Sequence, residues 1–192
     1  MSSAAPILIV GPSWVGDMMM AQSLFILLKQ HRHDCRIDVL APSWSIPLLA
    51  HMPEVSDTIL SPFKHGEAGL RQRYLLGKSL RDRHYEQAII LPNSLKSALV
   101  PFWARIPLRT GFTGEMRYGL VNDLRKLDRQ KLPRTVKRFA ALGLPANQPL
   151  PDELPNPQLH TNAEDTQKTF TALSLSMPDV AVLILCPGAE YG

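Results

Sequence analysis

The sequence has 192 residues, a formal net charge of +4 and a hydrophobic fraction of 45%. This length is sufficient for one well-buried core, or for one core and part of another. No apolar run reaches the roughly 20 residues of a membrane helix, and the start lacks the pattern of a signal peptide. We therefore expect a globular cytoplasmic protein, in which the distant Cys35 and Cys186 are structural thiols.

Short apolar runs alternate with amphipathic stretches along most of the chain. This alternation predicts an α/β fold, with a parallel sheet and helices on both of its faces. Ser43 is expected to cap a short helix, and a basic helix is expected to bury Leu70, Tyr74, Leu76 and Leu80. The expected strands are 7–10, 36–40, 57–60, 87–91 and 109–111, and the expected helices are 17–30, 44–51, 70–83, 94–104 and 135–142.

A proline-rich stretch predicts a domain boundary. Residues 144–157 include five prolines, a composition typical of an extended linker. We expect one domain over residues 1–150, followed at 151–192 by the linker and the truncated start of a second domain. A helix at 163–173 and a strand at 180–185 would open that second domain. A reaction that needs both domains is not expected from this chain alone.

Basic residues gather in two segments of the sequence. Five lie between Arg71 and Arg83, and seven lie between Arg125 and Arg138. Such clusters suit an anionic partner, either a phosphorylated glycolipid, a membrane surface or nucleic acid, although solvated helix faces are the simpler interpretation. No zinc-finger spacing, RNA-binding aromatic signature or heptad repeat accompanies them, so we expect no nucleic-acid partner. The histidines show no metal-ligand spacing, and no metal or cofactor is expected.

The first of three unusual loops is Gly11-Pro-Ser-Trp-Val-Gly-Asp17, after the first expected strand. Ligands of open parallel sheets bind at the carboxyl ends of the strands, and glycine permits close approach. The loop lacks both the Gly-Lys-Ser/Thr of a P-loop and the Gly-x-Gly-x-x-Gly pattern, which argues against a nucleotide here. Trp14 and Trp44 are interpreted as core residues, with stacking on a sugar ring as the alternative.

Asp17 has two interpretations at the start of the first expected helix. An acidic residue there is stabilised by exposed N–H groups and by the helix dipole. The alternative is a general base in a cleft between two domains. The dipole that stabilises the carboxylate also makes it a weaker base, and burial under a partner domain would restore its basicity.

The second and third loops offer cations. Lys96 lies in the first turn of a helix, where a positive charge opposes the dipole. This position favours contact with an anion, while a lysine that points into water is an equal alternative. The third loop, 109–118, is rich in glycine and offers Arg109 and Arg117.

Five motifs in chain order resemble the ADP-heptose:lipopolysaccharide heptosyltransferases of glycosyltransferase family 9, those of type II in particular. The resemblance covers almost the whole chain. The motifs are Gly-Pro-Ser-Trp-Val-Gly-Asp-Met-Met-Met, Leu-Pro-Asn-Ser-Leu-Lys-Ser-Ala-Leu-Val-Pro, Arg-Thr-Gly-Phe, Gly-Glu-Met-Arg-Tyr-Gly-Leu and Cys-Pro-Gly-Ala-Glu-Tyr-Gly. The resemblance implies the GT-B architecture, two Rossmann-like domains that face each other across a cleft, of which this chain supplies the amino-terminal half.

The resemblance also implies a reaction and its site. It implies an inverting transfer of L-glycero-D-manno-heptose from ADP-heptose to the first heptose of the lipid A–Kdo inner core. The enzyme would work in the cytoplasm of Gram-negative bacteria, in peripheral contact with the inner membrane. Asp17 would be the catalytic base. The implied acceptor-binding residues are Lys96, Arg117, Arg71, Arg73 and Arg138, and the implied edge of the donor site is Gly188, Ala189 and Glu190.

Two alternatives remain open at this level. One is a heptosyltransferase of type I, which would transfer to a Kdo acceptor. The other is a non-catalytic α/β binding module that is complete at this length.

Overall fold

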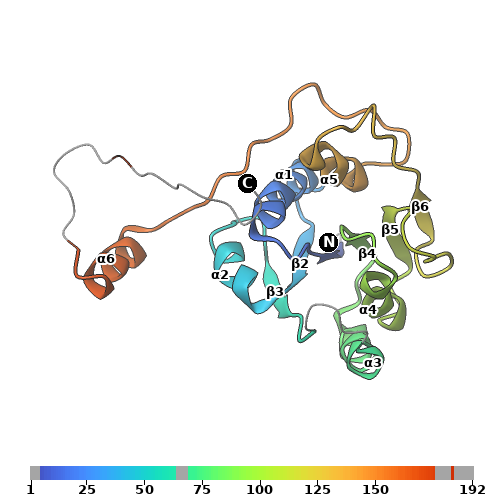
Figure 1. Cartoon of the computed structure of the whole chain (residues 1–192), viewed down its shortest axis with the longest axis horizontal. Coiled ribbons are helices and arrows are strands. Elements are labelled where there is room, and N and C mark those ends of the chain that lie inside the picture. The colour runs from blue at the N-terminus through green and yellow to red at the C-terminus, as the bar shows by residue number, and fades with distance from the viewer. Residues whose placement is uncertain (1–4, 64–68, 176–182, 184–192) are drawn as a thin grey trace. The chain divides into compact units, whose positions relative to one another are not determined.

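The computed structural model describes residues 5–63, 69–175 and 183. The chain divides into two compact units, Met1–Leu159 and His160–Gly192. The first unit contains a six-stranded parallel sheet in the order β3-β2-β1-β4-β5-β6, shown in Figure 1. This order, in which the chain reverses direction across the sheet between β1 and β4, is that of the Rossmann fold. The predicted α/β class with a Rossmann-like sheet is confirmed.

The elements follow the predicted alternation closely. The strands are β1 Pro6–Val10, β2 Arg36–Ala41, β3 Asp57–Leu60, β4 Gln87–Ile90, β5 Leu108–Phe112 and β6 Asp123–Arg125. The helices are α1 Val15–His31, α2 Ile46–Leu49, α3 Leu70–Ser79, α4 Leu99–Trp103, α5 Thr135–Gly143 and α6 Ala163–Ala172. Short 3₁₀ turns cover η1 Ser43–Ser45, η2 Arg81–Arg83 and η3 Leu95–Ala98. The sequence prediction missed β6, because Asp-Leu-Arg offers one apolar residue and no alternating pattern.

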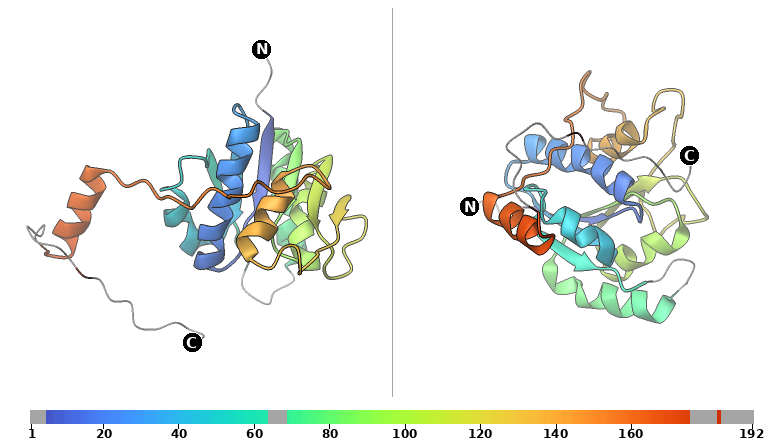
Figure 2. Two further views of the ribbon diagram at one scale, coloured as in Figure 1. Left: turned by 90° about the horizontal axis from the view of Figure 1, so that it is seen from above. Right: turned by 60° about the vertical axis from the view of Figure 1, so that its left-hand side comes forward.

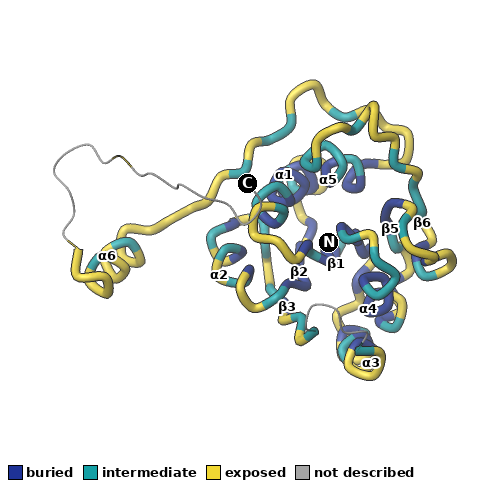
Figure 3. The backbone as a smooth tube through the Cα atoms, in the orientation of Figure 1, coloured by how far each residue is buried: buried dark blue, intermediate teal, exposed yellow. Residues whose placement is uncertain are grey.

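The sheet is buried on both faces, which explains its nearly continuous apolar strands. Ile7 and Ile9 of β1 pack with α1, α2 and α5 on one face. Leu8 and Val10 point the other way and pack with residues of α3 and α4. Figure 2 shows helices on both sides of the sheet, and Figure 3 shows buried backbone along its central strands. None of the helices within the described ranges is long and apolar enough to cross a membrane.

Helix α3 packs through a different face from the one expected. Leu80 is buried as predicted, but Leu70 and Tyr74 are 57% and 42% exposed. The face that packs instead includes Arg73 and Gly77. A Cβ on Gly77 would lie 2.7 Å from the Trp103 Cβ, so glycine is what allows α3 to approach α4 this closely. The prediction for Leu70 and Tyr74 was wrong because it counted apolar residues and ignored this close approach.

The expected helix cap at Ser43 is absent, and the proline-rich stretch makes tertiary contacts. Ser43 is the first residue of η1, and neither η1 nor α2 has a side-chain cap. The proline-rich stretch packs on the first unit, since Leu150 and Leu154 contact a buried cluster from α1 and α5. At its end, the Gln22 side chain exchanges two hydrogen bonds with the Gln158 backbone, at 2.8 and 2.9 Å.

The second unit is described only in part. Its helix α6 begins with a side-chain cap, in which Asn162 accepts a 2.6 Å hydrogen bond from the Asp165 backbone N–H. The strand predicted at 180–185 lies outside the described residues, apart from Leu183. The domain division proposed at residue 150 stays a prediction.

Candidate functional site at the carboxyl edge of the sheet

The loops that follow four strands meet around one cavity of about 260 Å³. It lies at the carboxyl ends of β1 and β4, the topological switch point where Rossmann-type sheets bind ligands. The first and second loops singled out in the sequence thus come together here. The cavity is lined by Val10, Gly11, Ser13, Leu40, Pro42, Trp44, Ser61, Phe63, Arg73, Pro92, Ser94, Lys96, Ser97 and Val100.

Two cations line this cavity. Lys96 is half-buried in η3, and no ion pair or hydrogen bond engages its ammonium group among the residues that the structure describes. The Arg73 guanidinium donates to the Lys96 carbonyl oxygen at 3.3 Å and stacks 3.8 Å above the Phe63 ring. Burial lowers the pKa of Arg73, because the charged form loses solvation. Both side chains therefore bring positive charge to a confined space that an anionic ligand would neutralise.

Arg117 lies against the 92–97 loop, but it is buried and not open to a ligand. It was expected to be a loop cation open to a ligand, yet it is 1% exposed. Its guanidinium donates to the carbonyl oxygens of Pro92 and Phe112, at 2.7 and 2.5 Å. It also donates to the Asn93 and Ser97 side chains, at 3.2 and 3.3 Å. These bonds occupy the guanidinium with protein partners. Arg117 therefore holds the loop that carries Lys96 and does not line the cavity.

A second set of contacts fastens the glycine-rich loop to the same segment. The Glu115 carboxylate accepts from the Leu95 backbone N–H at 2.9 Å, and the Glu115 N–H donates to the Asn93 carbonyl at 3.1 Å. A Cβ on Gly114 would collide with that carbonyl oxygen. The glycine of this motif is thus explained by close packing of two backbones. The third loop supports the second one and does not itself line the cavity.

Asp17 is half-buried in the first turn of α1, on the helix that begins just after the cavity-lining loop. In the described part of the chain, no hydrogen bond or ion pair engages its carboxylate. The N-cap residue, Trp14, makes no side-chain cap bond either. The carboxylate therefore does not cap α1 by a direct hydrogen bond, and its oxygens remain available to a ligand. Asp17 is not one of the cavity-lining residues, so a ligand would have to extend past the cavity to reach it.

The remaining predicted residues are not brought into the cavity. Arg71 is exposed on α3 and does not line it. Arg138 donates to the carbonyl oxygens of Leu132 and Pro133, at 2.9 and 2.7 Å, and so braces the loop before its own helix. The predicted donor-binding residues Gly188, Ala189 and Glu190 lie outside the described residues. In the described ranges, no group of three or more histidine, cysteine or acidic residues is arranged to hold a metal ion.

The interpretation of Trp14 and Trp44 as core residues was wrong. They are 52% and 56% exposed. Both lie in loops at the carboxyl edge, where few neighbouring atoms are available to cover a large ring. The Trp44 indole N–H donates to the Ser13 carbonyl oxygen at 2.8 Å and so joins the β2–α2 loop to the β1–α1 loop.

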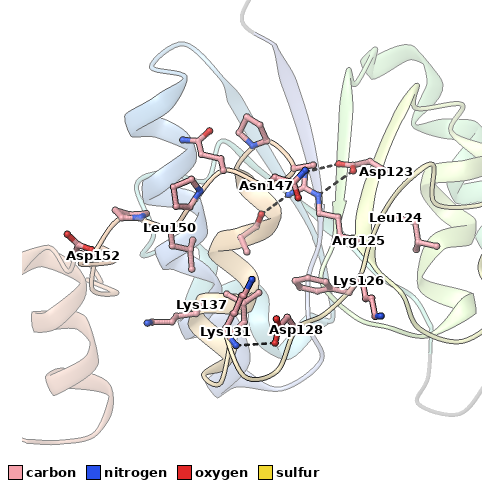
Figure 4. Close-up of a pocket in the computed structure, with 18 residues that line it drawn as sticks. Asp123, Leu124, Arg125, Lys126, Asp128, Lys131, Lys137, Asn147, Leu150 and Asp152 are labelled. Atoms are coloured by element: carbon pink, nitrogen blue, oxygen red, sulfur yellow. Dashed lines mark hydrogen bonds and ion pairs between the residues drawn. The ribbon is translucent and has the colours of Figure 1, made fainter.

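A larger cavity of about 860 Å³ lies between β5, β6, α5 and the proline-rich stretch, and Figure 4 shows its lining residues. Arg125 is fully used there, because it pairs with Asp123 at 2.7 Å and donates to the Ala141 and Leu144 carbonyl oxygens. The charges of both signs around it nearly balance. This cavity lacks the loops of β1 and β4, and it is not the switch-point site.

The opposite edge of the sheet holds a cluster of paired charges. Asp38 is fully buried, and its Oδ2 accepts from the Tyr85 hydroxyl at 2.6 Å, from Arg83 at 3.1 Å and from Arg36 at 3.2 Å. Its Oδ1 is buried and has no hydrogen-bond partner within the described residues. Arg83 also pairs with Asp57 at the start of β3. Burial and the Asp38 carboxylate raise the pKa of Tyr85 well above its usual range. This cluster, hereafter the amino-edge cluster, ties the starts of β2, β3 and β4 together.

The fold and cavity define a Rossmann-type α/β protein with a cavity at the carboxyl edge of its sheet, where proteins of this fold bind ligands. Comparison with known proteins narrows this class. Residues 73–192 match glycosyltransferase family 9 (heptosyltransferase). The chain therefore belongs to glycosyltransferase family 9.

Individual relatives agree with this assignment. The chain is 48% identical to lipopolysaccharide heptosyltransferase 2 of Escherichia coli K12 and 50% identical to lipooligosaccharide heptosyltransferase 2 of Haemophilus ducreyi. Each match covers 97% of this chain and 55% of the relative. The solved structure of E. coli ADP-heptose LPS heptosyltransferase II superposes with a TM-score of 0.82 at 46% identity, over 89% of this chain and 51% of that one. The chain thus spans about half the length of the curated relatives that it matches.

Proposed function

We propose that this chain forms the acceptor-binding half of an inverting heptosyltransferase of type II. The observation that carries the proposal is the cavity at the switch point, with the Lys96 ammonium group in its wall and Asp17 in the first turn of the helix that follows the cavity-lining loop. Among the described residues, neither charge has a hydrogen-bond or ion-pair partner. The relatives that match at 46–50% identity are named heptosyltransferase 2, which supports type II over the alternatives of type I or a non-catalytic module.

In the proposed reaction, ADP-heptose is the donor and the first heptose of the lipid A–Kdo inner core is the acceptor. Asp17 takes the proton of the acceptor hydroxyl while that oxygen attacks the anomeric carbon of the donor. The bond from the anomeric carbon to the diphosphate breaks, ADP leaves, and the configuration at that carbon inverts. One base is sufficient for this displacement, and its expected contribution is about a hundred- to ten-thousand-fold in rate.

The acceptor is anionic, since it carries carboxylates and phosphates. Lys96 and Arg73 would bind it through charge-assisted hydrogen bonds in the cavity. Arg117 contributes by holding the 92–97 loop, so its part in acceptor binding is proposed to be indirect. Arg71 is exposed and Arg138 is bound to its own loop, so any contact of theirs with the acceptor would lie outside this cavity. The acceptor is a membrane lipid, so we propose that the enzyme works at the cytoplasmic face of the inner membrane.

Two measurements test the proposal. First, titration calorimetry on the 192-residue chain should show binding of the deacylated Kdo–heptose oligosaccharide, and weak or no binding of ADP. Second, the chain is joined to the part of the E. coli relative outside the match and assayed with ADP-heptose. Transfer to a heptose-terminated acceptor is expected, and transfer to a Kdo-terminated acceptor is not. Tight ADP binding by the chain, or a preference for the Kdo-terminated acceptor, would contradict the assignment.

A further inference from the structure

The cavity at the carboxyl edge contains two aromatic side chains in different situations. Phe63 already has the Arg73 guanidinium stacked on its ring at 3.8 Å. Trp44 also lines the cavity but remains 56% exposed, the larger of the two exposures found for tryptophans at this edge. Of the two rings in the cavity wall, Trp44 is the one with a large aromatic surface open to a ligand.

The orientation of the Trp44 ring is fixed in advance. Its indole N–H donates to the Ser13 carbonyl oxygen at 2.8 Å, a bond between the loops that follow β1 and β2. Because one edge of the ring is held in this way, stacking a ligand on it would cost little side-chain entropy. Rigid aromatic rings with one polar edge are well suited to such recognition.

The chemistry around Trp44 favours a sugar over a nucleobase. Four serines line the same cavity, and the hydroxyls of three of them can bond a polyhydroxylated ligand, because only the fourth, Ser97, is engaged by the Pro92 and Ser94 carbonyls and by Arg117 in the described structure. Lys96 and Arg73 add positive charge, which suits a carboxylate or phosphate on that ligand. The three available serines are Ser13, Ser61 and Ser94.

We propose that Trp44 is a stacking platform for a sugar ring of the anionic acceptor and helps to determine acceptor specificity. The proposal rests on the function proposed above. The C–H face of the sugar would lie on the indole, while its hydroxyls and acidic groups face the serines and the two cations. Trp14 is not included, because it does not line the cavity.

The test compares Trp44→Phe with Trp44→Ala in the 192-residue chain, by titration calorimetry with the deacylated Kdo–heptose oligosaccharide. Trp44→Ala removes the aromatic face, and its dissociation constant is expected to rise about three- to tenfold. Trp44→Phe keeps an aromatic face but loses the N–H, and it is expected to retain most of the affinity. The loss in Trp44→Ala should be the same at low and high salt, because stacking is not screened as charge contacts are.

The controls separate this proposal from its rivals. Trp103→Ala is the matched variant, because Trp103 packs edge-on against Tyr74, with ring centroids 5.8 Å apart, and does not line the cavity. Circular dichroism and melting curves check the fold of each variant. ADP and inorganic phosphate are titrated in parallel, and their binding is expected to be unaffected by Trp44→Ala.

Three results would overturn the platform and leave the proposed function standing. They are unchanged oligosaccharide affinity in Trp44→Ala, an equal loss in Trp44→Phe and Trp44→Ala, and a loss of ADP affinity in place of oligosaccharide affinity. An equal loss would show that Trp44 acts only through its bond to Ser13. Failure of the unsubstituted chain to bind the oligosaccharide would overturn both proposals.

Discussion

The two edges of the sheet use the same kinds of side chain in opposite ways. At the amino edge, Arg83 and Arg36 both have carboxylate partners, and the buried Asp38 is shared between them. At the carboxyl edge, Lys96 has no such partner within the described residues, and Asp17 has no bond to its carboxylate. Removing one partner of a buried ion pair leaves the other charge uncompensated and costs stability, whereas charges without a protein partner are available to a ligand.

This contrast predicts that substitutions at the amino edge lower stability and spare binding and turnover, while substitutions of the unpaired charges at the carboxyl edge lower binding or turnover and spare stability. The largest effect is expected from Asp17→Asn. In the chain joined to the remaining part of the E. coli relative, turnover should fall about a hundred- to ten-thousand-fold, because the proposed base is lost. Acceptor affinity and melting temperature should hardly change, since the carboxylate makes no hydrogen bond within the described structure. Asp34→Asn, at an exposed position, is the matched control.

Near-normal turnover of Asp17→Asn would contradict its role as a base. The interaction of Asp17 with the dipole of α1 would then be the better explanation of its position.

The next largest effect is expected from Arg117→Ala, which should lower both stability and acceptor binding. It removes a buried guanidinium that satisfies the Pro92 and Phe112 carbonyls, and it should cost about 3 kcal/mol of stability. Acceptor binding should weaken as well, because the loop that carries Lys96 loses its support. Chemical denaturation and calorimetry would measure the two effects. Full stability with weakened acceptor binding would show instead that Arg117 reaches the ligand directly.

Asp38→Asn tests the amino edge. It removes a fully buried charge from Arg36, Arg83 and the Tyr85 hydroxyl, and we expect a loss of about 2 kcal/mol in the free energy of unfolding. Oligosaccharide affinity should be unchanged, because the cluster lies at the far edge of the sheet. A loss of affinity without a loss of stability would contradict the assignment of the amino edge to stability and of the carboxyl edge to binding.

Lys96→Ala should have a smaller effect, and on binding alone. We expect the acceptor dissociation constant to rise about tenfold at low salt, as for a hydrogen bond to a charged group, and less at high salt. Melting temperature should not fall, since the ammonium group has no partner among the described residues. Lys78→Ala is the control, because Lys78 is exposed on α3 and does not line the cavity. Equal behaviour of the two variants would place the acceptor elsewhere.

The smallest expected effect is that of pH on the stability contributed by Asp57 at the amino edge. The hydrogen bond from Arg83 holds the pKa of Asp57 below its ordinary value. Such a group stabilises the fold above the unfolded pKa of about 4, and this stabilisation is lost as the pH falls through the lower, folded pKa. Melting temperature should therefore decline below about pH 4. Asp57→Asn should reduce that decline only modestly, because the Asp57 side chain is 47% exposed. A steeper acid decline in Asp57→Asn than in the unsubstituted chain would contradict this sign.

Much of the fold could be predicted from local sequence patterns. Apolar runs such as that at Ile7–Val10 predict strands directly, because burial on both faces of a parallel sheet leaves nearly continuous apolar strands. The loops that carry Asp17 and Lys96 were found for the same reason, since they follow strands whose carboxyl ends share one edge.

Only the tertiary structure showed which way the side chains point and which groups they contact. Sequence showed that Arg73 and Arg117 are basic, but not that one lines a cavity and the other is buried against backbone carbonyls. It likewise could not show that Trp44 is exposed, or that Gly77 lets α3 approach α4 through an unexpected face. These outcomes depend on atoms brought close by residues far apart in the chain. Spacing along the chain therefore identifies the loops of the site, while packing between elements determines which of their side chains remain available to a ligand.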